Sequence, residues 1–118
     1  MGLDVGFYRK EEEIFYLRNH HDFFELLDER IGGRVDDIHD DFYVTLSTLD
    51  LVDARLEQLF ASCGIAASHA LTKVPARFYD LDARETALDD LLRYYPAFVE
   101  LVRSDIIKQG PLICGWSA

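Results

Sequence analysis

The sequence has few cysteines, few basic residues and no long apolar run. Its 118 residues include two cysteines, Cys63 and Cys114, and each lies among apolar neighbours. A domain of this size gains little from one disulfide, so we expect two free, buried thiols, with a single disulfide as the alternative. No window approaches the roughly 20 apolar residues of a membrane helix, and no apolar stretch typical of a signal peptide follows Met1. We therefore expect a cytoplasmic protein with no membrane partner.

Motifs for catalysis are also missing. The serines at 47, 62 and 68 lack the Gly-x-Ser-x-Gly turn of an activated nucleophile, and neither cysteine has a recognisable nucleophile setting. The spacing of Gly2 and Gly6 does not match a phosphate-binding loop. The sequence thus favours a binding protein over an enzyme.

Residue types that bind metals gather in one part of the chain, namely His20, His21, His39, Asp40 and Asp41. A zinc site needs several ligands that converge on one ion. Neighbouring helical residues point about 100° apart, so His20 and His21 do not easily face the same ion. The aspartates between 36 and 41 lack the spacing of a calcium loop. We predict no metal and no cofactor, and keep a small metal-dependent enzyme using His20, His39 and Asp41 as the alternative.

Acidic residues are concentrated between positions 11 and 57. This segment has fourteen Asp and Glu against four Arg, which accounts for the whole net charge of −10. Such a field repels nucleic acid and anionic membranes and attracts basic protein surfaces. Eight Phe, six Tyr and one Trp exclude a disordered acidic tail, because such tails lack the aromatic residues that form a core.

Local patterns predict an α+β domain. Segments rich in aromatic and β-branched residues predict strands at 3–9, 42–46 and 112–116, and weakly near Phe78. Apolar spacing and acids in a first turn predict a helix over 11–31. Ser47 with Asp50 predicts the start of a second helix that ends near Cys63, with Gly64 as its left-handed cap.

The second half of the chain predicts further helix. Asp82 with Glu85 repeats the capping pattern, and apolar spacing then continues to Gly110. Pro96 either kinks this helix or begins a new one. The fold class we predict is α+β, a small sheet of about three strands covered by three or four helices in one domain. We expect the two terminal strands to be neighbours, and we predict a core that includes Leu56, Phe60, Leu91, Leu92 and Val102.

Short motifs give a resemblance to one family. The chain opens Met1-Gly2-Leu3-Asp4, continues into an aromatic strand and then reads EIFYLRNH over 13–20. In these motifs it resembles a family of small uncharacterised bacterial and phage proteins that open Met-Gly-Leu-Asp. The likeness extends to Phe78-Tyr79, Glu85-Thr86 and Trp116-Ser117. The resemblance implies a small α+β protein, cytoplasmic or phage-borne, and it carries over no functional residue.

The acidic segment leads to a functional hypothesis. Carboxylates about 5–6 Å apart on a helix approximate the phosphates of a nucleic-acid strand. We therefore expect a phage-type or immunity-type inhibitor that occupies a basic, nucleic-acid-handling surface of a protein partner and does not itself bind nucleic acid. Its predicted partner-binding residues are Asp22, Glu25, Asp28, Glu29, Asp36, Asp37, Asp40 and Asp41. The alternative is acidity that only keeps a structural or accessory protein in solution; the oligomeric state is left open.

Overall fold

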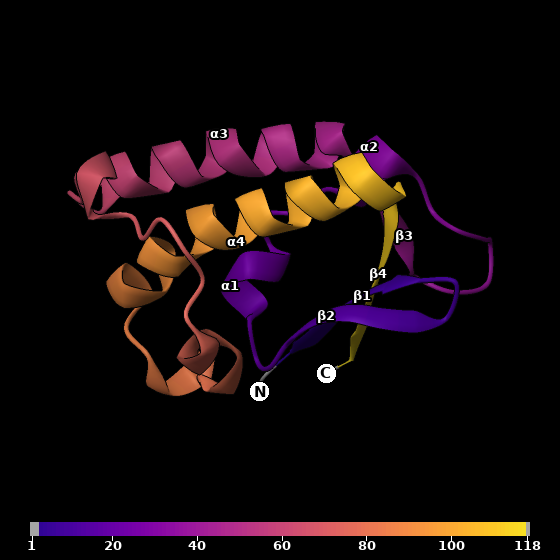
Figure 1. Ribbon diagram of the computed structural model, residues 1–118, viewed down its shortest axis with the longest axis horizontal. Coiled ribbons are helices and arrows are strands. Elements are labelled where there is room, and N and C mark those ends of the chain that lie inside the picture. Colours follow the sequence, from indigo (N-terminus) through magenta and orange to yellow (C-terminus); the bar gives the residue numbers. More distant parts are fainter. Residues whose placement is uncertain (1–2, 118) are drawn as a thin grey trace.

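A four-stranded antiparallel sheet lies beside two long helices in the computed structural model, which describes residues 3–117 (Figure 1). The strands are β1 (Asp4–Arg9), β2 (Glu12–Leu17), β3 (Phe42–Val44) and β4 (Leu112–Ser117), in the order β2-β1-β4-β3. The α+β class is confirmed, and so is the pairing of the terminal strands β1 and β4. The prediction of about three strands is wrong, because β2 was taken for helix.

The segment 11–31 is not one helix. Arg9 pairs with Glu12, so β1 and β2 form a hairpin whose two turn residues, Lys10 and Glu11, have φ of 51° and 68°. Positive φ at both central positions is typical of the tight hairpin turn, where Asn-Gly is the usual signal. Lys-Glu gives no such signal, and the acids that we assigned to a first helical turn lie in the turn and in β2. Two short helices follow, α1 (His21–Phe24) and α2 (Glu29–Gly32).

The two long helices follow the predicted spacing, but their starts differ. Helix α3 (Leu46–Ser62) begins at a capping box formed by Thr45 and Thr48, not at Ser47 and Asp50. Gly64 has φ of 67° and ends the helix as predicted. Helix α4 (Leu88–Gln109) runs through Pro96 without a new start. Proline at that position donates no backbone bond to the preceding turn.

The connection between α3 and α4 consists of three short 3₁₀ helices, η1 (Ala67–His69), η2 (Ala76–Asp80) and η3 (Ala83–Glu85). The prediction of a strand near Phe78 is therefore wrong. Phe78 lies in η2 and is fully buried against the ring of Phe98, 5.5 Å between centroids. Asp82 accepts a hydrogen bond from the backbone N–H of Arg84 and so caps η3, not α4.

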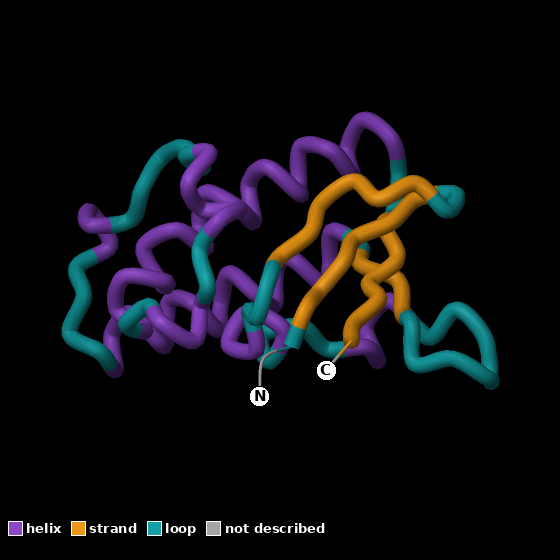
Figure 2. Tube along the Cα trace, turned by 90° about the horizontal axis from the view of Figure 1, so that it is seen from below, coloured by secondary structure: helices purple, strands orange, loops and turns teal. Residues whose placement is uncertain are grey.

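The core lies between the long helices and one face of the sheet. All five predicted core residues are buried, and they meet Val5, Phe7, Leu112 and Cys114 from the strands. Both cysteines are free as predicted, with Cys114 buried and Cys63 only half-buried. Seen from below, the other face of the sheet is not covered by any element of residues 3–117 (Figure 2). Within the same residues, no helix combines the length and the apolar character needed to cross a membrane.

Candidate partner-binding surface

Residues 34–41, here called the acidic loop, leave the body of the protein between α2 and β3 and return as an ordered excursion. Its base is closed by the bridge between Arg34 and Phe42 and by the hydrogen bond from Val35 N to Asp41 O, 3.0 Å. Residues 36–40 are all exposed. The loop is thus an exposed connection with a defined shape.

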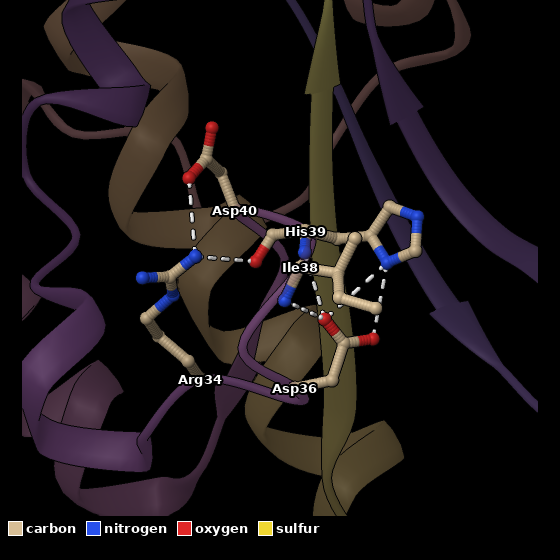
Figure 3. Close-up of polar contacts among 5 residues, drawn as sticks. All are labelled: Arg34, Asp36, Ile38, His39 and Asp40. Atoms are coloured by element: carbon tan, nitrogen blue, oxygen red, sulfur yellow. Dashed lines mark hydrogen bonds and ion pairs between the residues drawn. The ribbon is translucent and has the colours of Figure 1, made fainter.

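Asp36 holds the loop together from inside (Figure 3). Its carboxylate accepts hydrogen bonds from the backbone N–H of His39 at 2.7 Å and of Ile38 at 2.8 Å, and contacts the ring nitrogen Nδ1 of His39 at 3.0 Å. These bonds lower the pKa of Asp36 to about 2, and the backbone bond from His39 contributes most. The same carboxylate raises the pKa of His39. Asp36 therefore stays charged and shapes the turn.

Arg34 fastens the second half of the loop. One terminal nitrogen of its guanidinium donates to the carbonyl oxygen of His39 at 2.7 Å and to a carboxylate oxygen of Asp40 at 3.3 Å (Figure 3). Its attachment to a backbone carbonyl fixes the chain direction at the tip of the loop. The tip is therefore held on both sides, by Asp36 and by Arg34.

Ile38 is the most exposed large apolar residue that the structure describes, at 86%. It lies at the tip of the loop, directly after Asp37, and its own backbone N–H donates to the Asp36 carboxylate (Figure 3). An exposed apolar side chain on an ordered backbone loses little further entropy on binding, which suits it to serve as an anchor. The charge of this loop is evident from its amino acids, whereas the exposure of Ile38 on an ordered backbone is not.

The eight predicted partner-binding acids divide into two groups. Among residues 3–117, four make contacts within the molecule: Glu25 with His21, Asp28 with Arg30, Asp36 within the loop and Asp40 with Arg34. The hydrogen bond from the Arg30 side chain, with further bonds, lowers the pKa of Asp28 to about 2. Within the same residues, the side chains of the other four form no hydrogen bond or ion pair: Asp22, Glu29, Asp37 and Asp41.

These acids do not form the continuous array that we expected. That array required one helix over 11–31, but Asp22 and Glu25 belong to α1 and its end, and Asp28 and Glu29 to the start of α2. Helix α1 lies near the middle of the long axis, whereas the acidic loop extends at one end (Figure 1). The geometric comparison with a row of phosphates therefore has no support. The loop is the part of the predicted surface that remains coherent.

The candidate metal ligands are not brought together. His20 is fully buried, and its Nδ1 lies 2.8 Å from the hydroxyl of Tyr95. Burial lowers the pKa of His20 to about 4. His21 pairs with Glu25 at 2.8 Å, and His39 pairs with Asp36 in the loop. Within residues 3–117, no three His, Cys, Asp or Glu side chains are placed to hold a metal ion.

Sequence reasoning missed a second feature, a hollow of about 300 Å³ on the uncovered face of the sheet. Tyr8 and Tyr16 line it, together with Asp4, Asp41 and two glycines. Its lining residues on β1 are Asp4, Gly6 and Tyr8, so a period of two in 4–8 is the signal that locates it. Comparison of the chain with protein-family models, with curated proteins and with solved structures finds no match.

Proposed function

We propose that this protein is an acidic binding protein that docks its acidic loop onto a basic surface of a protein partner. The partner surface is of the kind that handles nucleic acid, where Lys and Arg are clustered, and the protein acts as an inhibitor by occupying it. The observation that carries the proposal is the ordered tip of the loop, where the 86% exposed Ile38 stands among carboxylates.

Two physical properties support this assignment. Exposed carboxylates attract a basic partner over a Debye length of about 8 Å at physiological salt and so accelerate encounter. An apolar anchor such as Ile38 then slows dissociation, because its removal from water is favourable only in the complex. Charge and anchor occur together at the loop tip, whereas Ile107, the next most exposed large apolar residue at 66%, lies on helix α4.

The test neutralises the loop without removing its internal bonds. In the variant Asp36→Asn, Asp37→Asn, Asp40→Asn, each amide oxygen still accepts hydrogen bonds, so the loop keeps its shape. Wild-type and variant protein are used to capture basic proteins from cell extract at low salt, and the recovered partner is then purified. We expect association with that partner to slow about tenfold or more and its salt dependence to flatten.

The control removes the same charge elsewhere, in Glu12→Gln, Asp80→Asn, Asp89→Asn, three acids that are exposed in β2, η2 and α4. If both triple variants slow association equally, bulk charge alone explains the effect and the loop is refuted as the docking element. In the same assay, Ile38→Ser is expected to speed dissociation about tenfold, and Ile107→Ser to leave it unchanged.

A further inference from the structure

The uncovered face of the sheet has a floor made by two glycines. Gly6 of β1 pairs directly with Gly115 of β4, so no side chain rises from the centre of this face. The ring of Tyr8 lies over the pair: a Cβ atom at Gly6 would overlap it, and one at Gly115 would lie 3.4 Å from Cε2 of Tyr8. An aromatic ring over paired glycines is a known way to cover exposed strand backbone. The hollow described above opens beside this ring.

The first wall of the hollow is a hydrogen-bonded pair on β1 and β2. The hydroxyl of Tyr16 donates to Oδ2 of Asp4 at 2.5 Å, and the backbone N–H of Asn19 donates to Oδ1 at 2.9 Å. The bond from Tyr16 lowers the pKa of Asp4, with smaller contributions from Arg18 and Arg84, and raises the pKa of Tyr16 to about 12. Asp4 is thus a fixed anion with an aromatic ring beside it.

The second wall is Asp41, the last residue of the acidic loop. Its Oδ1 would lie 3.6 Å from a Cβ at Gly115, so the carboxylate reaches the floor next to the ring of Tyr8. Asp41 is half-buried and, within residues 3–117, its carboxylate has no hydrogen-bond or ion-pair partner. A half-buried carboxylate without a partner favours a cation that supplies one. Burial, with Glu13 and Asp41, also raises the pKa of Tyr8.

We propose that this hollow is a socket for an arginine side chain of the protein partner; the proposal rests on the function proposed above. Two carboxylates and two phenol rings line the hollow, and no Lys or Arg is among the lining residues that the structure describes. A guanidinium is planar, stacks on aromatic rings and binds carboxylates through two parallel bonds, whereas the ammonium of lysine offers only a point charge. A volume of about 300 Å³ accepts one such group.

The test uses N-acetyl-arginine amide as the probe and N-acetyl-citrulline amide as its uncharged control of the same shape. Binding is followed by NMR through the backbone amides of Gly6, Gly115 and Trp116, three residues that line the hollow. We expect saturable shifts with the arginine probe and none with citrulline. Saturable binding of both probes with equal affinity, or no saturation with arginine, would overturn the proposal.

Two variants locate the effect. Asp41→Asn is expected to weaken binding of the arginine probe about tenfold or more, since the amide oxygen can still accept a hydrogen bond but no longer carries the charge that strengthens it. Asp37→Asn, which removes the same charge from the loop tip, is expected to leave it within twofold. Equal weakening by both variants would refute the socket. Gly6→Ala, which displaces the ring of Tyr8, is expected to weaken binding as well.

The socket and the docking function fail separately. The arginine probe needs no partner, and the loop variant used to test docking keeps Asp41. Loss of partner binding in the loop variant, with no saturable probe binding, would refute the socket and leave the docking function standing. The reverse result would refute the acidic loop as the docking element and retain the socket.

Discussion

Gly32 is the residue at which the packing of the loop region is most restricted. A Cβ atom at this position would overlap the backbone carbonyl of Tyr43, so α2 lies directly against β3. The backbone N–H of Tyr43 also donates to the carbonyl of Gly33 at 2.9 Å. The contact holds together the two ends from which the acidic loop departs. A glycine pair such as Gly32-Gly33 is easily interpreted as a helix stop, but here its first member is required for close approach.

The substitution Gly32→Ala is therefore expected to destabilise the protein by about 1–3 kcal/mol, because a backbone neighbour cannot move aside as a side chain can. Urea denaturation measures the change in the free energy of unfolding. Gly115→Ala is the control, since its Cβ would make only ordinary contacts with Tyr8 and Asp41, and it is expected to change stability by no more than about 1 kcal/mol. Similar losses for both variants would contradict the role of the α2–β3 contact.

The elements that the sequence predicted correctly are those that local patterns specify. The strands at both ends, β3 and the apolar spacing of α3 and α4 need only β propensity or helical periodicity. The β1–β2 hairpin was not predicted, because its turn residues, Lys10 and Glu11, adopt positive φ without the usual sequence signal. For the candidate site, the sequence identified the acidic residues. It did not show that some of them pair with Arg30 and Arg34, nor that Ile38 is exposed. The alignment of Tyr8 with Tyr16 also follows only from the tertiary structure.

The hairpin turn gives a prediction at the scale of the element. A left-handed conformation costs a non-glycine residue roughly 1–2 kcal/mol. Glu11, with φ of 68°, carries that cost, so Glu11→Gly is expected to stabilise the protein by about 1 kcal/mol. The neighbouring Glu12 is extended in β2, and Glu12→Gly is expected to destabilise the protein by about 0.5–1 kcal/mol, because glycine has more chain entropy in the unfolded state to lose on folding. Thermal unfolding compares the two variants, and the prediction is wrong if both shift the melting temperature in the same direction.

At the scale of the whole molecule, acids lie outside and one histidine lies inside. His20 is fully buried, with the ring of Phe78 at 5.2 Å between centroids and Tyr95 bonded to its Nδ1. Within the described residues its Nε2 is buried and has no hydrogen-bond partner. The fold therefore holds the neutral imidazole, because a second proton on the ring would place a charge in the core on a group whose Nε2 has no partner. The stability of the protein at low pH thus depends on the buried His20 as well as on the exposed carboxylates.

The consequence is a loss of stability in two steps as the pH falls. The unfolded chain takes up a proton at His20 near pH 6.5, whereas the folded protein does so only near its lowered pKa of about 4. Stability from this group is thus complete above pH 6.5 and is lost between about 6.5 and 4, a total of about 3 kcal/mol. The carboxylates of Asp28, Asp36 and Asp82 have pKa values lowered to about 2, so the stability that they contribute is lost only below about pH 4.

Urea denaturation at pH 7 and pH 5 tests the first step, and pH 5 stays above the sequence pI of about 4.6. The double variant His20→Leu, Tyr95→Phe removes the buried base and its hydroxyl partner together, so neither polar group is left unsatisfied. We expect the wild type to lose about 2 kcal/mol more than this variant between the two pH values. The control His69→Gln changes a histidine exposed on η1 and is expected to follow the wild type. Equal losses in the wild type and the double variant would show that His20 is not the group that couples folding to pH.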